Sequence, residues 1–340
     1  MSAIATPNKP RRLPIGWIVR VLVSAAVLTI LFQKVPAAKV WADVQLIPPL
    51  LWLAALALFL VGHAASAGKW LFLIGPGVSY GQAFRAHLAG LAANLCLPGV
   101  AGGDVVRAGL VFGSAKDKSA LAMGSLADRL LDTLGLLIIS AVGMLLVAGH
   151  ASGNARFIVP ILIVFLVGLV VAFVMTIGLD RWFGSRAPGG KVMRLAAKIT
   201  SAASTLARRP SRLILCLSMS MAVQALFVGV NIAFANAVGI KAPAAAWFFA
   251  WSASKIIAIA PISLGGLGVR ESSMAYLMSQ YGAAWDQVIA VGLIWQTVLY
   301  ASGAIGAVVQ AVWRPGKPGA AEPCESMLGS ALTPEGTVRD

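Results

Sequence analysis

The chain has 340 residues, of which 59% are hydrophobic and only 11% are charged. Soluble domains carry about 25% charged residues, so this composition excludes an ordinary water-soluble domain and indicates an all-α, polytopic membrane protein. A net charge of +15 is also seen in nucleic-acid-binding proteins, but here the basic residues fall between apolar runs, where a bilayer favours them. We therefore expect membrane lipids, and no nucleic acid, as partners.

Six apolar runs are long enough to cross the roughly 30 Å of hydrocarbon in a bilayer. They lie near residues 15–32, 47–74, 119–148, 157–179, 212–239 and 287–313. Two shorter apolar stretches, 80–97 and 243–260, each run into a Pro- and Gly-rich phrase and are typical of half-helices. The sequence thus predicts a helical bundle with about six full spans and two re-entrant half-helix hairpins.

The basic residues indicate how the bundle is oriented. Lys and Arg precede the first apolar run, and the segment 180–212 carries eight basic residues against the single acid Asp180, so both regions should be cytoplasmic. We expect a cytoplasmic N-terminal segment, 1–14, and a transmembrane domain, 15–313, with a basic cytoplasmic loop at 180–211. A disordered cytoplasmic tail, 314–340, should follow, which places both termini in the cytoplasm.

A helix-breaking phrase occurs twice in the chain, 163 residues apart. It reads LCLPGVAGGDVVRAGLV at 95–111 and AIAPISLGGLGVRESSM at 258–274. Each copy places a Pro, a Gly-Gly pair and an Arg at the same offsets; these are Pro98, Gly102, Gly103, Arg107, Pro261, Gly265, Gly266 and Arg270. Three predicted spans lie between the copies, and because this number is odd we expect the second copy to be inverted, as in many transporters.

The chemistry of the phrase favours an anion. Two consecutive glycines let successive N–H groups converge, and the helix that restarts after them points its positive end the same way. An Arg at membrane depth is costly unless paired or hydrated, and its guanidinium group suits a phosphate. Asp104 is placed to cap the restarting helix and to neutralise Arg107, while Glu271 lies beside Arg270. Alternatively, the glycines only permit tight packing and each Arg extends to the lipid headgroups.

A charged cluster lies in the predicted span 119–148. Asp128 and Asp132 share one helical face at i,i+4, and Arg129 can pair with Asp132 at i,i+3. Two interpretations remain open. The cluster could relay protons or hold its Arg ready for a phosphate, or it could be a self-neutralised structural triad.

Three further polar residues stand in apolar sequence. Asn94, four residues before the first Pro, could bond the backbone that the helix break frees. Lys69 and Lys255 are isolated cations, and we expect Lys255 to be the better site candidate because Ser252 and Ser254 flank it.

The sequence contains few motifs that are typical of an enzyme. The chain has no H-E-x-x-H, no G-x-S-x-G and no Walker sequence, and its three histidines have no companion carboxylate at metal-binding spacing. Its three cysteines are an odd number without paired spacing, which favours neither a disulfide framework nor a zinc site. We expect no cofactor, no metal and no catalytic residue.

Three segments resemble a known family. NLCLPGVAGGDVVRAGLV (94–111), ADRLLD (127–132) and PISLGGLGVRESS (261–273) are similar to the hallmark segments of the lysylphosphatidylglycerol synthase transmembrane region, also called the flippase-like domain family. The resemblance covers about residues 15–313 and implies a protein of the bacterial inner membrane. In the full-length synthases this region is associated with moving an aminoacylated phospholipid across the bilayer, and a separate cytoplasmic domain makes that lipid. Only 27 residues follow residue 313 here, so we expect a stand-alone member without the aminoacyltransferase domain.

The phrase and the resemblance together predict a lipid translocase. Its headgroup site should use backbone donors and guanidinium groups from Gly102, Gly103, Gly265, Gly266, Arg107 and Arg270. The resemblance implies an aminoacylated phospholipid, a polyprenyl-linked lipid or a hopanoid-type lipid as cargo. Two alternatives remain. The chain could be a non-transporting membrane partner of a separately encoded glycosyl- or aminoacyl-transferase, or an enzyme at the bilayer surface that uses Asp128 and Asp132 as acid and base.

Overall fold

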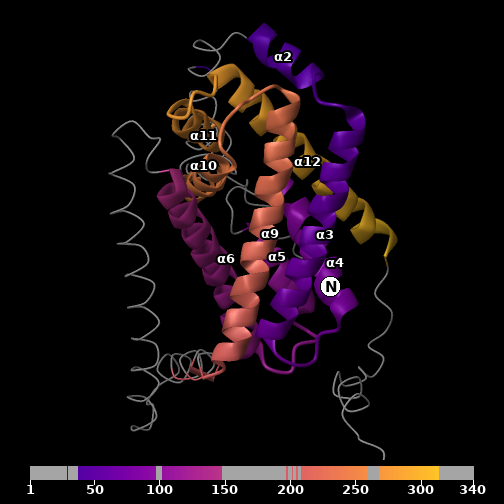
Figure 1. The fold of residues 1–340 in the computed structure, drawn as a ribbon. Coiled ribbons are helices and arrows are strands. Elements are labelled where there is room, and N and C mark those ends of the chain that lie inside the picture. Colours follow the sequence, from indigo (N-terminus) through magenta and orange to yellow (C-terminus); the bar gives the residue numbers. More distant parts are fainter. Residues whose placement is uncertain are drawn as a thin grey trace, which may run out of the picture.

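The computed structural model describes residues 37–96, 102–147, 208–258 and 268–313, with a few single positions between them. Every regular element in these ranges is an α-helix, which confirms the predicted all-α class for this part of the chain (Figure 1). In chain order the helices are α2 (Ala37–Gln45), α3 (Pro49–Ile74), α4 (Tyr80–Cys96), α5 (Gly102–Val111), α6 (Lys118–Val147), α9 (Pro210–Ala237), α10 (Ala244–Ile257), α11 (Val269–Ser279) and α12 (Trp285–Val312).

Four helices, α3, α6, α9 and α12, are long and apolar enough to cross a membrane. The shortest, α3, has 26 residues and measures about 39 Å at 1.5 Å per residue, which exceeds the roughly 30 Å of bilayer hydrocarbon. These helices match four of the six predicted spans, which are confirmed as helices of membrane-crossing length. The predicted spans at 15–32 and 157–179, and most of the basic loop, lie outside the described residues.

Two short hairpins lie between the long helices. α4 packs against α5, and α10 packs against α11. α5 has 10 residues and α11 has 11, so each is about 15 Å long, half the thickness of the hydrocarbon core. α4 ends at Cys96 and α10 ends at Ile257, so each helix stops where the repeated Pro- and Gly-rich phrase begins, as the sequence predicts.

The two hairpins enter the bundle from opposite ends (Figure 1). The mouth of the α4–α5 hairpin, meaning the end where α4 begins and α5 ends, lies where α3 ends. There the backbone N–H of Lys116 donates to the carbonyl of Pro76 at 3.3 Å. The mouth of the α10–α11 hairpin lies where α11 leads into α12. The first turn of α12 carries Asp286, which forms an ion pair at 3.7 Å with Lys39, shortly before α3 begins. The second mouth is therefore at the N-terminal end of α3.

Each hairpin is held by a long helix from the other half of the chain, because α4 packs against α12 and α10 packs against α6. Glycines allow both contacts to be close. A Cβ at Gly143 of α6 would lie 2.6 Å from the backbone nitrogen of Phe249 in α10, and a Cβ at Gly306 of α12 would overlap the carbonyl of Leu88 in α4. Helices inside a bilayer gain little from hydrophobic burial, so they depend on such close backbone packing.

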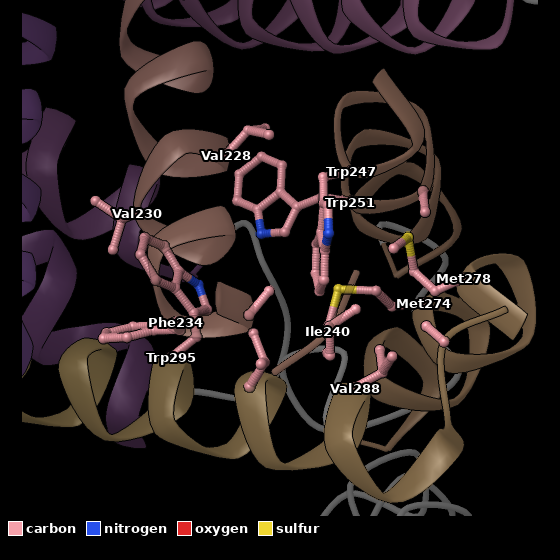
Figure 2. Close-up of a cluster of buried hydrophobic side chains, with 14 of the residues drawn as sticks. Val228, Val230, Phe234, Ile240, Trp247, Trp251, Met274, Met278, Val288 and Trp295 are labelled. Carbon is pink, nitrogen blue, oxygen red and sulfur yellow. The ribbon is translucent and has the colours of Figure 1, made fainter. Parts of the chain in front are cut away.

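The second hairpin lies in an apolar, aromatic core. Trp247, Trp251 and Phe234 are at most 2% exposed, and Trp295 of α12 packs against Trp251 with ring centroids 6.1 Å apart at 82° (Figure 2). Figure 2 shows these rings converging from α9, α10 and α12. The surroundings of the first hairpin are different, because buried charges gather there.

Candidate functional site

Three charged side chains are buried where α3, α5 and α6 meet. Lys69 is 1% exposed, Arg107 4% and Asp128 2%. The Nη2 group of Arg107 donates to Asp128 Oδ2 at 2.9 Å, and the other carboxylate oxygen lies 3.1 Å from Lys69 Nζ. A single carboxylate on α6 thus forms ion pairs with one cation from α5 and one from α3.

The contacts continue on both sides of this centre. Lys69 also donates to Asp132 and, at 2.8 Å, to the hydroxyl of Ser220 on α9. At the other side Arg107 lies 3.4 Å from Asp104, which accepts hydrogen bonds from Arg129. The six charged residues alternate in sign, and we call them the ionic chain: Arg129, Asp104, Arg107, Asp128, Lys69 and Asp132.

The ionic chain carries three positive and three negative charges, so its formal charge is zero. Neutrality matters because an unpaired charge in a medium of low dielectric costs several kcal/mol, whereas each of these groups has a partner of opposite sign. The chain also joins helices that are distant in sequence. It links α3, α5 and α6 directly and reaches α9 through Ser220, which donates to Asp132 at 2.8 Å.

Two histidines extend the network from Arg107 into the core. Arg107 Nη1 lies 3.1 Å from His87 Nδ1, and His87 Nε2 lies 2.8 Å from His63 Nδ1. Because a guanidinium group only donates, His87 Nδ1 must accept, which leaves the His87 proton on Nε2 to donate to His63. The guanidinium of Arg107 also lies over the ring of Trp70, 4.4 Å from its centroid. Arg107 is thus fixed on several sides.

The second hairpin carries a smaller polar group. Arg270 donates to its sequence neighbour Glu271 and to Gln296 of α12 at 2.9 Å. Glu271 is 2% exposed and also accepts the backbone N–H of Gly268 at 2.8 Å, so it caps the start of α11. Gly268 has φ of +82°, a left-handed conformation in which a side chain is unfavourable.

Lys255 on α10 is held differently. Its Nζ donates to Gln224 Oε1 at 3.0 Å and lies 4.7 Å from the ring centroid of Trp251. Within the described ranges it forms no ion pair with a carboxylate. The charge of Asp132 acts on it favourably, and those of Arg129, Arg270 and Lys69 oppose it. Because Asp132 is already paired with Lys69, Lys255 has no carboxylate of its own among the described residues.

The predicted residues of the first phrase come together. Asn94 Oδ1 accepts the backbone N–H of Gly103 at 2.9 Å, which confirms that Asn94 bonds the freed backbone. Asp104 lies in the first turn of α5, which begins at Gly102, and its predicted pairing with Arg107 is confirmed. Gly103 cannot carry a side chain, because a Cβ there would meet Gly90 and Asn94 of α4.

Part of the predicted site cannot be compared with the structure. Gly265 and Gly266 lie outside the described residues, so the meeting of the two glycine pairs stays a prediction. In the described part of the chain, no group of three or more His, Cys, Asp or Glu is arranged to hold a metal ion.

Sequence reasoning missed several members of the site. It ranked Lys255 above Lys69, whereas Lys69 lies within the ionic chain; it also considered His63 and His87 only as metal ligands and overlooked Ser220. One signal could have identified Lys69. A charged residue near the end of a 26-residue apolar helix needs a buried partner, and Asp128 and Asp132 were available on another span.

One edge of the network is accessible. The side chain of Arg129 is 42% exposed and those of Asp104 and Asp132 are 27% exposed, whereas those of Lys69 and Asp128 are exposed by 3% or less. Arg270, on the other hairpin, is 14% exposed. The charges of Arg129, Asp132 and Arg270 all act on Lys255, so these four residues from both halves of the chain lie near one another, and we call them the polar site.

Comparison with known proteins agrees with this architecture. No curated protein matches the chain. The family model of the lysylphosphatidylglycerol synthase TM region matches residues 17–306, which include all the described helices except the end of α12. The membrane-length helices and this match show an integral, multi-pass membrane protein, and the chain belongs to the family of the lysylphosphatidylglycerol synthase TM region.

Proposed function

We propose that this protein is a lipid translocase that carries a phosphate-bearing headgroup across the bilayer through the polar site. The cargo belongs to the classes that the resemblance implies: an aminoacylated phospholipid, a polyprenyl-linked lipid or a hopanoid-type lipid. The proposal places the protein in the bacterial inner membrane with both termini in the cytoplasm, in agreement with its basic segments.

The observation that carries the proposal is the unmatched charge of Lys255. The ionic chain is neutral by itself and Arg270 has Glu271, so Lys255 leaves the polar site with one positive charge in excess. A cation inside a bilayer protein needs a counter-charge or water, and by default it marks a functional site. A lipid phosphate supplies the missing negative charge.

The two arginines of the repeated phrase can bind a lipid phosphate by exchanging their carboxylate partner for it. Arg107 and Arg270 each contact a carboxylate, and a phosphate can replace that carboxylate because both groups offer two acceptor oxygens to a guanidinium fork. Arg129 is the most exposed cation of the ionic chain and would meet the headgroup first. Arg107, buried behind it, would follow.

Transport of this kind requires that the site open to each leaflet in turn. In the proposal the two hairpins are inverted repeats, which supply equivalent inward-open and outward-open arrangements. Supporting this, Gly143 and Gly306 are 163 residues apart, the same offset as Arg107 and Arg270, and each contacts the hairpin of the other half. The opposite entry of the hairpins is a second support.

A vesicle assay tests the proposal. Purified protein is reconstituted with a fluorescent phospholipid, and the fraction reached by a membrane-impermeant quencher is followed with time. We expect Lys255→Gln and Arg270→Ala to slow translocation, Lys255→Arg to retain it, and Lys39→Gln, whose side chain is 71% exposed, to leave it unchanged. If Lys255→Gln and Arg270→Ala both translocate as fast as the unmodified protein, the polar site does not carry the headgroup.

The non-transporting alternative gives a different result in the same preparation. A scaffold for a separately encoded glycosyl- or aminoacyl-transferase would purify with that enzyme, and the protein alone would move lipid no faster than protein-free vesicles.

A further inference from the structure

An apolar groove runs along the outside of the bundle between α6, α9 and α10. Its volume is about 450 Å³, and its lining includes Ile139, Val142 and Leu146 from α6, Ala222 and Ala225 from α9, and Phe248 from α10. Among the described residues, no polar side chain lines it. Val142 is 50% exposed and Leu146 68%, so the groove is open along its length rather than enclosed.

Small residues create the groove. α6 and α10 touch backbone to backbone at Gly143 and Ala245, which brings the two helices together at its floor. On α9 the groove is lined by Met221 and by Ala222 and Ala225, whose short side chains leave space that leucines would fill. The hollow is therefore a consequence of three helices that meet with short side chains between them.

The groove leads into the polar site. On α6, Asp132, Ile139 and Leu146 follow at intervals of seven residues and so share one face. On α10, Phe248 and Lys255 are also seven residues apart. Each helix thus presents a continuous stripe that is polar at one end and apolar along the groove.

The polar ends of these two stripes lie at the same depth. α6 and α10 run in opposite directions and touch at Gly143 and Ala245. Asp132 lies 11 residues before this contact on α6, about 16 Å, and Lys255 lies 10 residues after it on α10, about 15 Å. α9 closes the polar end, because its Gln224 accepts a hydrogen bond from Lys255.

The dimensions suit one hydrocarbon chain. From Asp132 to Leu146 the stripe covers 14 residues, or about 21 Å, whereas a lipid tail in one leaflet spans about 15 Å, half of the 30 Å core. A tail of that length fits along this stripe, of which the part from Ile139 to Leu146, about 11 Å, lines the groove, while a polyprenyl chain longer than one leaflet would extend beyond the stripe. The cation Lys255, which donates to the neutral side chain of Gln224, lies at the polar end and complements a phosphate at the end of such a tail.

We infer that the groove holds one acyl chain of a glycerophospholipid whose phosphate lies at Lys255. This inference rests on the proposed function, and it specifies both the cargo and the position of its tail. A headgroup held at the polar site keeps its tail beside the protein, and the groove is the adjoining space that accepts it.

Photo-crosslinking tests the inference directly. The protein carries p-benzoylphenylalanine in place of Phe248 and is reconstituted in vesicles of phosphatidylglycerol and phosphatidylethanolamine. After irradiation we expect the mass of one phospholipid to be added, and we expect Lys255→Gln to reduce this adduct. The same photoreactive residue in place of Leu145, which is 74% exposed on another face of α6, reports bulk lipid and should not respond to Lys255→Gln.

Three results would overturn the inference: a crosslink from position 248 to the chain's own peptide 157–179, a polyprenyl adduct from cell membranes, or a phospholipid adduct that Lys255→Gln does not change. A substitution that fills the groove tests whether lipid translocation depends on it. We expect Ala225→Trp to lower translocation to the level of protein-free vesicles, while Leu215→Trp, at a position 51% exposed on the same helix, does not.

The two proposals can fail separately. If the unmodified protein translocates no lipid but the adduct at position 248 still depends on Lys255, the proposed function is wrong and the groove remains a lipid site. If translocation depends on Lys255 while the adduct does not, or while Ala225→Trp has no effect in correctly folded protein, only the groove is wrong.

Discussion

The ionic chain makes a quantitative prediction about Asp128. This carboxylate is 2% exposed and forms ion pairs with both Lys69 and Arg107. Asp128→Asn would leave the chain with three cations and two carboxylates, one positive charge in excess. Removal of one partner from a buried ion pair costs about 3–5 kcal/mol, because the remaining charge stays buried without compensation. We expect a loss of stability of this size.

The protein is unfolded with increasing concentrations of a denaturing detergent. The fluorescence of its ten tryptophans reports the unfolding. Asp117→Asn is the matched control, because it is the same substitution at the residue just before α6. There Asp117 Oδ1 accepts the backbone N–H groups of Ser119 and Ala120 at 2.8 and 3.2 Å. Asn caps a helix about as well as Asp, so this variant should unfold like the unmodified protein.

A second substitution tests whether charge balance is the cause. Adding Lys69→Met to Asp128→Asn restores neutrality, and because the two residues touch we expect the double variant to be more stable than the sum of the single losses by about 0.5–3 kcal/mol. If Asp128→Asn and Asp117→Asn unfold at the same detergent concentration, or if the two losses simply add, then the reasoning from buried charge is refuted.

Further predictions concern packing and are measured by the same unfolding. Gly124→Ala should cost about 1–3 kcal/mol because its Cβ would overlap the carbonyl of Leu73, whereas Gly109→Ala, with nothing within 4 Å, should cost nothing; equal losses would contradict this. Trp295→Ala should cost about 3–5 kcal/mol by leaving a cavity in the aromatic core of Figure 2, and an unchanged midpoint would show that the core repacks. Asn94→Ala should cost about 1 kcal/mol by removing the acceptor at the start of α5, and no loss would mean that the bond contributes nothing.

Much of the architecture could be predicted because it depends on local sequence. A run of apolar residues must form a helix in a bilayer, since no water is present to satisfy the backbone, and Pro and paired Gly must interrupt it. The four described spans and the ends of α4 and α10 follow from this rule. The pairing of Asp104 with Arg107, three residues apart, followed from helical spacing.

The composition of the site depended on contacts between distant segments. Lys69 lies 59 residues before Asp128 and 151 before Ser220, so no spacing rule connects them, and His87 meets Arg107 only because α4 folds back on α5. The groove arises where three helices present apolar side chains to one another, and its position depends on where Gly143 lets α6 approach α10. The sequence alone determined which segments enter the membrane, because hydrophobicity is a property of each segment. Only the tertiary structure decided which charges neutralise one another, because Coulomb attraction depends on distances that packing alone sets.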